Sequence, residues 1–387
     1  MVILIIENIN LEKLMGANIM KIKSIFCGSL ITISFFINII SAKDLKSQLF
    51  KPVLCPFKNA TIQTNPLLIQ KAAKDALLYF DNPNPKYEKM THSSKIAPKL
   101  IDTKKAKKSL EFLVNIIEKD KKRPSFRILD TAFLKKHFNF VKWFGDLEAA
   151  KKNKVHIPKW PDGGRLKRGK IKLTGYAVFA LNGSYKKTPK YKHALYGIVD
   201  PGFMKNDRFK YSRQEIITGV LEKHVQQKQI KPLIWLTQEG LEEAMLQGTA
   251  FVTMTDNKTK IFNVHVSNKM DYIKSLDKTK KQKKYWYFKD VTKHQKEQLK
   301  FINYGGTVFA GNINDIGLGK IIALFYTNPI TQKEDIRLGI LLDRGSAFSN
   351  NLYQLDLFAG IFKNRQGFKK YMRHLPNTTN AYILVKK

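Results

Sequence analysis

Residues 341–347 read LLDRGSA and residues 355–360 read LDLFAG, so two aspartates follow apolar runs near the end of the chain. Asp343 and Asp356 both stand in strand-like contexts with glycines close by. Burial of such an aspartate raises the pKa of its carboxyl, and a carboxyl that keeps its proton near neutrality can act as a general acid. The same pattern is typical of aspartates that cap strands or form turns. By itself it therefore makes Asp343 and Asp356 candidate catalytic residues and does not establish an active site.

Upstream of the two aspartates, from residue 171 onward, short apolar runs bounded by turn residues follow one another. Many short strands at this spacing favour β-barrels over alternating strand–helix–strand units. Helical patterns interrupt the strands at Arg213–Gln226 and Gln238–Leu246. The expected strands are Leu173–Leu181, Ala194–Val199, Thr249–Met254, Lys260–Val266, Thr307–Ala310, Ile321–Tyr326, Ile336–Leu342 and Ala381–Val385.

The part of the chain before residue 171 is more helical in pattern. Helices are predicted at Leu67–Tyr79, Lys104–Ile117 and Leu129–Phe140, the second from apolar residues at helical spacing. We therefore predict a mainly β protein with helices, whose N-terminal region is α-helical.

The composition is that of a folded protein with a large positive charge. Of its 387 residues, 43% are hydrophobic and 11% aromatic, which excludes overall disorder. The formal charge of +38 suggests nucleic acid, an anionic membrane or an acidic polymer as partner. However, only ten of the 69 basic residues are arginines, whereas phosphate-binding proteins favour the planar arginine fork. A lysine excess beside many isoleucines and asparagines is typical of an AT-rich genome.

The first 42 residues have the plan of a secretory leader. The stretch MKIK at residues 20–23, with two lysines, precedes the apolar run Ile25–Ile40, and the small residues Ser41 and Ala42 follow. We expect translation to start at Met20 and cleavage to follow Ala42. The remaining sequence holds no apolar run of the roughly 20 residues that a membrane-spanning helix needs.

Cysteine use fits an exported protein without a lipid anchor. Neither Cys27 nor Cys55 follows the small residues of a lipoprotein signal. Cys27 would leave with the leader, so Cys55 would stand alone, which excludes an internal disulfide and a cysteine-based metal site. We predict a periplasmic location in a Gram-negative type of bacterium and a monomeric protein.

Several other kinds of site find no support. The sequence lacks a phosphate-binding loop, zinc-ligand spacing among its eight histidines and a G-x-S-x-G nucleophile turn. Residues 278–287 combine lysines with aromatic residues that can stack on nucleic acid bases, although a solvated loop before an amphipathic strand explains them as well. We predict no cofactor and no metal.

The motifs together resemble those of the lytic murein transglycosylase A family (MltA). The resemblance covers the chain from about residue 130 to its end, and the pieces occur in the family's order. They are residues 132–138 (AFLKKHF), 174–176 (TGY), 182–184 (NGS), 195–196 (LY), 211–216 (YSRQEI) with Gly219, 246–249 (LQGT), Asn268 with Tyr272, and the two aspartate motifs.

This resemblance implies a double-psi β-barrel with a second β-domain inserted, and a groove for a glycan strand between them. It divides the chain into a leader (1–42), a helical N-terminal part of the catalytic domain (43–172), the inserted domain (173–298) and the barrel part with the catalytic aspartate (299–387). Asp356 would be the catalytic acid and base, and Asp343 its supporting carboxylate. The residues implied to bind the glycan are Thr174, Tyr176, Gln247, Gly248, Thr249, Asn268 and Tyr272.

The implied reaction cleaves the β-1,4 bond between N-acetylmuramic acid and N-acetylglucosamine in peptidoglycan, with formation of a 1,6-anhydro sugar. The sequence departs from the family pattern after the TGY motif, where Ala177, Val178 and Phe179 follow, and at Ala250, where the family has glycine. Two alternatives therefore stay open: a murein-binding protein of the same fold with impaired catalysis, and a basic binder of nucleic acid or anionic surfaces.

Overall fold

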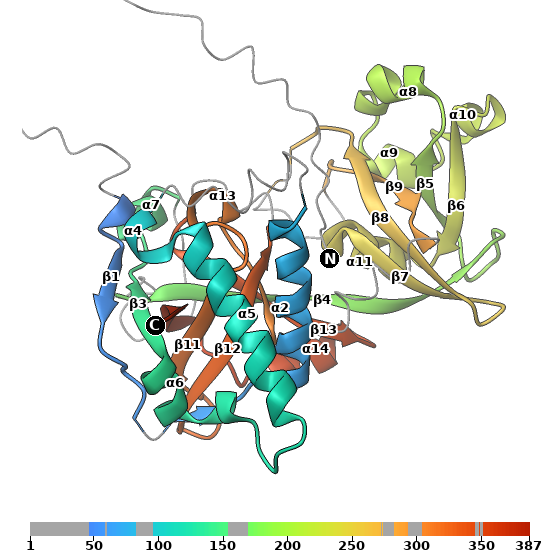
Figure 1. Ribbon diagram of the computed structural model, residues 1–387. Coiled ribbons are helices and arrows are strands. Elements are labelled where there is room, and N and C mark those ends of the chain that lie inside the picture. Colours follow the sequence, from blue (N-terminus) through green and yellow to red (C-terminus); the bar gives the residue numbers. More distant parts are fainter. Residues whose placement is uncertain are drawn as a thin grey trace, which may run out of the picture.

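The computed structural model describes residues 46–58, 60–82, 96–153, 169–271, 273, 282–292, 304–344, 348 and 351–387. The expected leader, Cys27 and Tyr272 lie outside these residues. In the described part of the chain, no helix is long and apolar enough to cross a bilayer. The chain forms two lobes, each with its own hydrophobic cluster, and the long strand β4 (Ile171–Ser184) runs from one lobe into the other (Figure 1).

Six strands of the first lobe close into a barrel. Neighbouring strands pair around the ring, and β14 meets β4 to complete it. The β10–β12 and β13–β4 pairs are parallel, whereas the other pairs of the ring are antiparallel. This closed sheet with surrounding helices confirms the prediction of a mainly β barrel protein. In order, the strands are β14 (Thr378–Lys386), β11 (Ile321–Thr327), β12 (Glu334–Asp343), β10 (Val308–Ala310), β13 (Gln354–Phe362) and the first half of β4.

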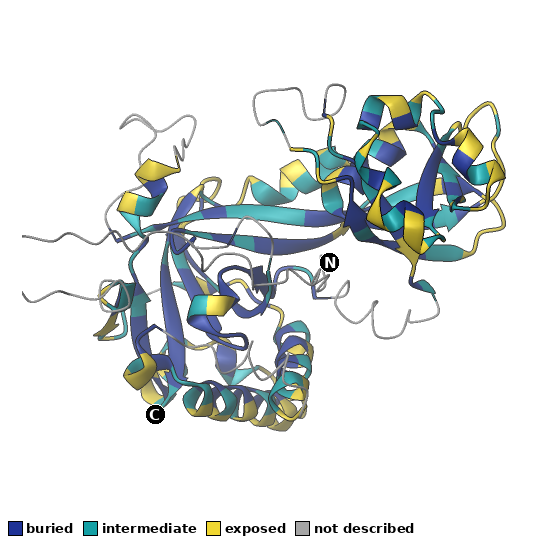
Figure 2. Ribbon diagram, turned by 90° about the horizontal axis from the view of Figure 1, so that it is seen from above, coloured by how far each residue is buried: buried dark blue, intermediate teal, exposed yellow. Residues whose placement is uncertain are grey.

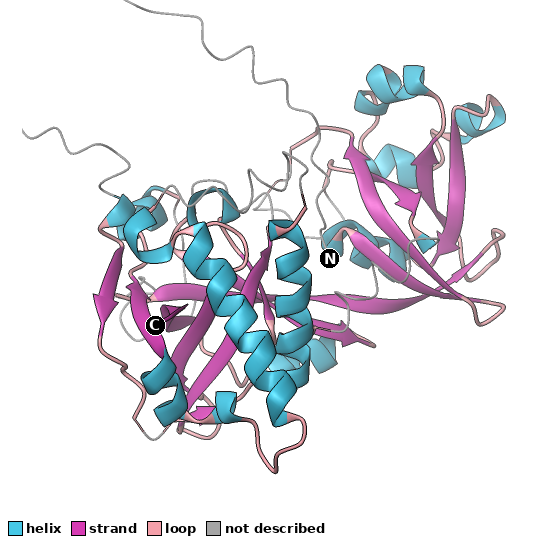
Figure 3. Ribbon diagram, in the orientation of Figure 1, coloured by secondary structure: helices cyan, strands magenta, loops and turns pink. Residues whose placement is uncertain are grey.

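Helices and additional strands surround this barrel. The two long helices, α2 (Pro66–Phe80) and α5 (Thr103–Asp120), pack on each other and against β12 and β14 (Figure 3). Outer strands are β1 (Phe50–Val53) and β3 (Phe138–Trp143), which continue the sheet beyond β14, and β2 (Thr61–Ile62), which pairs with β12. Shorter helices of this lobe are α4 (Pro98–Ile101), η2 (Arg127–Leu129), α6 (Thr131–His137), α7 (Leu147–Lys152), α13 (Ile313–Ile316) and α14 (Arg365–Met372).

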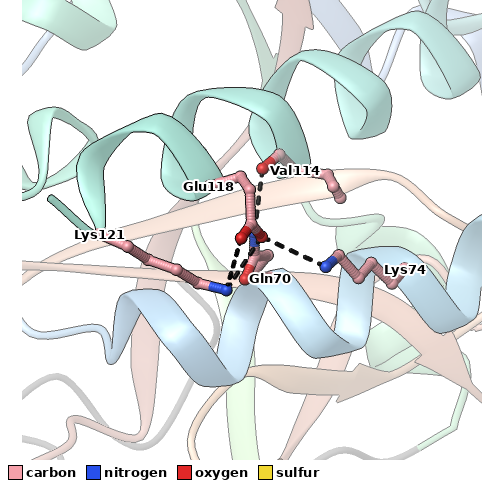
Figure 4. A network of polar contacts seen from close by, with 5 residues as sticks. All are labelled: Gln70, Lys74, Val114, Glu118 and Lys121. Atoms are coloured by element: carbon pink, nitrogen blue, oxygen red, sulfur yellow. Dashed lines mark hydrogen bonds and ion pairs between the residues drawn. The ribbon is translucent and has the colours of Figure 1, made fainter.

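A polar network fixes the two long helices to each other (Figure 4). The Glu118 carboxylate on α5 accepts hydrogen bonds from the Lys121 ammonium at 2.9 Å and from Gln70 Nε2 on α2 at 2.8 Å. Gln70 Nε2 also donates to the Val114 carbonyl at 3.0 Å, and Lys74 Nζ lies 3.4 Å from Glu118. The bonds from Lys121 and Gln70 lower the pKa of Glu118 to about 2. The network sets the register of α2 against α5, so we assign it a structural role.

The second lobe is built around the far half of β4. There β4 pairs in parallel with β7 and antiparallel with β6, and the sheet continues through β8 and β9 on one side and β5 on the other. Buried residues follow the strands of both lobes (Figure 2). The strands are β5 (His193–Ile198), β6 (Ile230–Leu236), β7 (Thr249–Met254), β8 (Thr259–Ser267) and β9 (Trp286–Asp290); the helices are α8 (Pro201–Lys205), η3 (Asp207–Phe209), α9 (Arg213–Ile217), α10 (Glu222–Gln226) and α11 (Gln238–Gln247).

Two of the predicted helices differ in the structure. The helix expected over Leu129–Phe140 ends at His137, because residues 138–143 pair with β14 and β1 as strand β3. The helix expected over Arg213–Gln226 is split into α9 and α10. Gly219 lies between them at φ 104°, a backbone conformation that a helix cannot contain.

Candidate active site

The register of two neighbouring strands brings the first site residues together. In the parallel pair of β13 and β4, Asp356 lies opposite Thr174, and Phe358 lies opposite Tyr176. The Thr174 hydroxyl donates a hydrogen bond to Asp356 Oδ1. Since side chains two residues apart on a strand share a face, Thr174 and Tyr176 both project from the same side of β4.

Asp356 accepts a second hydrogen bond from its own strand. Gln354 Nε2 donates to Asp356 Oδ1 at 2.9 Å and to the Thr174 hydroxyl oxygen at 2.8 Å. Both donors to Asp356 therefore reach Oδ1, and within the described residues no donor reaches Oδ2. A proton on this carboxyl would therefore reside on Oδ2, the oxygen that no described donor reaches.

Burial dominates the electrostatics of Asp356. Desolvation raises its pKa to about 6, although the hydrogen bond from Gln354 and the positive charge of Lys172 act in the opposite direction. The negative charge of Asp343 raises the pKa further. At pH 6 about half of the Asp356 carboxyls would hold a proton, which is the state that a general acid requires.

Asp343 is held by two donors at the end of β12. The Tyr176 hydroxyl donates to Asp343 Oδ2 at 2.6 Å, and the Arg344 backbone N–H donates to Oδ1 at 2.7 Å. Burial raises the pKa of Asp343, while these hydrogen bonds lower it. Tyr176 stays protonated because burial and the neighbouring Asp343 raise its pKa well above the usual value. Tyr176 thus links strand β4, which pairs with the strand that carries Asp356, to the carboxylate of Asp343.

The short strand β10 sets the separation of the two aspartates. Ala310 lies opposite Asp343 on one side and opposite Asp356 on the other. Because neighbouring strands are about 4.8 Å apart, the backbones that carry the two aspartates are separated by about 10 Å. The barrel therefore brings residues 174–176, 343 and 354–356 into one cluster.

The Gln247, Gly248 and Thr249 segment lies further along β4. Ala180 of β4 pairs with Phe251 of β7, six residues beyond Thr174, which corresponds to about 20 Å of strand. Gly248 ends α11 in the left-handed conformation at φ 73°, and its N–H donates to the Ala244 carbonyl. The buried Thr249 hydroxyl donates to Asn263 Oδ1 at 3.1 Å, whereas Gln247 is partly exposed.

Asn268 lies apart from the carboxylate cluster, in the second lobe. Its Nδ2 donates to the carbonyls of Tyr211 and Lys283 at 2.9 and 3.0 Å. Its Oδ1 accepts from the backbone N–H groups of Tyr285 and Met270. The buried side chain thus uses its hydrogen-bonding groups on four backbone partners, which points to a structural role. Tyr272, predicted to act with it, lies outside the described residues.

Two residues of the cluster were not among the sequence candidates. Gln354 and Lys172 each precede a candidate by two positions on the same strand, Asp356 and Thr174 respectively. The two-residue period of a strand could have identified both, because it places them on the candidates' face of the sheet. Among the described residues, no group of three or more His, Cys, Asp or Glu side chains could hold a metal ion.

The two lobes and their connections are similar to those of solved lytic transglycosylases. A membrane-bound lytic murein transglycosylase from Agrobacterium tumefaciens superimposes with a TM-score of 0.54 at 13% identity, over 87% of this chain and 97% of that one. The MltA of Escherichia coli with bound chitohexaose superimposes with a TM-score of 0.55 at 13% identity, over 88% and 95%. No protein-family model and no curated protein sequence matches this chain. The chain is therefore similar in fold to these lytic transglycosylases.

Proposed function

We propose, from the MltA fold and the geometry of the barrel aspartates, that the chain is a peptidoglycan lytic transglycosylase. The observation that carries the proposal is Asp356, whose pKa of about 6 and hydrogen-bonded Oδ1 suit a general acid with its proton on Oδ2. The chitohexaose in the Escherichia coli neighbour is an oligosaccharide, which supports a glycan as ligand here.

In the proposed reaction, Asp356 protonates the oxygen that links N-acetylmuramic acid to N-acetylglucosamine. The glycosidic bond breaks and positive charge develops at C1 of the muramic residue. The ionised Asp356 then removes the proton from the C6 hydroxyl of the same sugar, whose oxygen closes on C1. The products are a 1,6-anhydro sugar and a free glycan end, and no water is consumed. One carboxyl suffices because attack is intramolecular, unlike the paired carboxyls of most glycosidases.

The neighbouring residues have separate roles in this proposal. Gln354 and Thr174 orient the carboxyl of Asp356 by binding Oδ1. Asp343, held by Tyr176, places a negative charge near the developing positive charge at C1. Gln247, partly exposed at the end of α11, would contact a sugar more distant from the cleaved bond, while Gly248 and the buried Thr249 form the turn that holds it.

Peptidoglycan lies outside the cytoplasmic membrane, so the proposed function requires export. The apolar run Ile25–Ile40 with small residues after it fits a cleaved secretory signal and a periplasmic enzyme. The +38 charge would hold the protein near a wall whose peptides carry free carboxylates.

The test is digestion of purified murein sacculi with the full chain and with Asp356→Ala, followed by mass spectrometry. Anhydromuropeptides from the wild type but not from the variant support the proposal. Sacculus binding without products supports the impaired murein binder instead. If neither occurs but DNA binds with a steep salt dependence, the basic nucleic-acid binder is favoured.

A further inference from the structure

The second lobe contains a pocket far from the carboxylate cluster. It encloses about 420 Å³, including its open mouth, between the loop that joins β4 to β5, the end of β6 and the segment that joins α9 to α10. Ser184, at the end of β4, pairs with Trp235 of the pocket wall. Ten residues of β4 separate Ser184 from Thr174, or about 33 Å of strand, so the pocket does not belong to the reaction site.

One side of the pocket is basic. Lys187 and Lys192 lie in the loop that joins β4 to β5, and Lys187 Nζ lies 5.5 Å from the centre of the Trp235 ring. Within the described residues neither ammonium group has an ion-pair partner. His193 lies beside them, and burial followed by the charge of Lys192 lowers its pKa, so its ring is uncharged near neutrality. Two ammonium groups without an ion-pair partner, beside a neutral imidazole, favour a carboxylate ligand.

The other side of the pocket is acidic. The carboxyl of Glu222 on α10 faces the pocket next to Gly219, and among the described residues it has no ion-pair partner. The break at Gly219 that separates α9 from α10 brings residues 216–219 and Glu222 into the wall. Trp235 and the buried Tyr285 complete the lining with apolar surface.

A ligand that matches this lining carries a carboxylate for the lysines, an ammonium group for the glutamate and an aliphatic chain between them. We propose that the pocket binds the stem peptide of peptidoglycan, with the carboxylate and ammonium groups of its diamino acid on Lys187, Lys192 and Glu222. This inference rests on the proposed function and deepens it, since it names peptide-substituted glycan as the substrate. The peptide in the pocket would belong to a sugar several units from the cleaved bond, or to a neighbouring strand.

The test measures binding of a synthetic stem peptide, L-Ala-γ-D-Glu-meso-diaminopimelate, to the full chain by calorimetry. Lys187→Ala/Lys192→Ala should weaken binding at least tenfold, because charge-assisted hydrogen bonds are lost. The matched control is Lys119→Ala/Lys122→Ala, which removes the same charge from exposed positions in the other lobe and should leave the affinity unchanged. The wild type should not bind the same peptide with its carboxylates amidated.

The role of Glu222 has its own comparison. Glu222→Gln should weaken binding of the diaminopimelate peptide but not of a peptide with 2-aminopimelate, which lacks the second amine. Equal binding of the amidated peptide, unchanged binding by the double lysine variant, or no effect of Glu222→Gln would each overturn the assignment. Absence of anhydromuropeptides in the sacculus digest would refute the catalytic proposal but would not change the peptide-binding titrations. The proposed activity and the proposed peptide site can therefore fail independently.

Discussion

Asp356→Asn tests the electrostatics of the candidate site through protein stability. The folded protein raises the pKa of Asp356 from 3.8 to about 6, chiefly through burial. The charged carboxylate is therefore less stable in the folded than in the unfolded chain. About two pKa units at about 1.4 kcal/mol each correspond to about 3 kcal/mol.

The pH range of the effect follows from the direction of the shift. Below pH 3.8 both states hold the proton, so the variant and the wild type should be equally stable apart from local packing. Between 3.8 and about 6 the unfolded chain loses its proton first, and the wild type loses stability as the pH rises. Above about 6 the difference is constant. We therefore expect Asp356→Asn to be more stable by about 3 kcal/mol at pH 8, while it loses the proposed transglycosylase activity.

The assay is urea unfolding of both proteins at pH 4, 6 and 8, followed by fluorescence. Asp120→Asn is the control with the opposite sign. Burial raises the pKa of Asp120, but its bonds to Arg127 outweigh burial and lower it, so this variant should be less stable at pH 8 and approach the wild type in acid. A stability difference for Asp356→Asn that does not change with pH, or a loss of stability at pH 8, would refute the reasoning.

Gln354→Leu should raise the pKa of Asp356 by about one unit, because it removes a hydrogen bond to the charged carboxyl, and the alkaline limb of the pH–rate profile should move upward accordingly. Glu243 of α11 and Arg365 of α14 form an ion pair between the lobes, with the glutamate side chain only 7% exposed. Glu243→Arg should lower the unfolding free energy by about 2 kcal/mol, and adding Arg365→Glu should restore part of it, as urea unfolding can measure. Gly248→Ala should lower the unfolding free energy by about 1 kcal/mol, because alanine disfavours φ 73°.

Matched variants separate these effects from general damage. Gln63→Leu removes an exposed glutamine that donates to Asp335 on β12, away from Asp356, and should leave the pH–rate profile in place. Gly367→Ala lies in a helix where the added methyl group meets only ordinary contacts, and should not lower stability. If the Glu243→Arg/Arg365→Glu pair is no more stable than the sum of the single changes predicts, the two side chains do not interact across the lobes.

Strand periodicity and strand bounds were largely readable from the sequence. The expected strands at residues 249–254 and 321–326 differ from β7 and β11 by at most one residue at an end. The strand β6 has no counterpart among the expected strands, although it pairs within the second lobe. The strand β9 agrees with the amphipathic strand expected after the lysine-rich loop. The short apolar pattern of residues 138–140 is compatible with a helix or a strand, and from the sequence we predict a helix. In the structure these residues form a strand because they pair with β14.

The sequence by itself predicted a protein with a β-barrel and two partly buried aspartates, because apolar runs and neighbouring glycines are patterns of a few consecutive residues. Only the tertiary structure decided which atoms meet. Gln354 and Thr174 lie 180 positions apart, and the closure of β14 on β4 and the pairing of β13 with β4 bring them into contact. The break at Gly219 likewise created a pocket between residues that the helical pattern had placed on one continuous helix. Such contacts depend on strand register between remote segments, which no local pattern encodes.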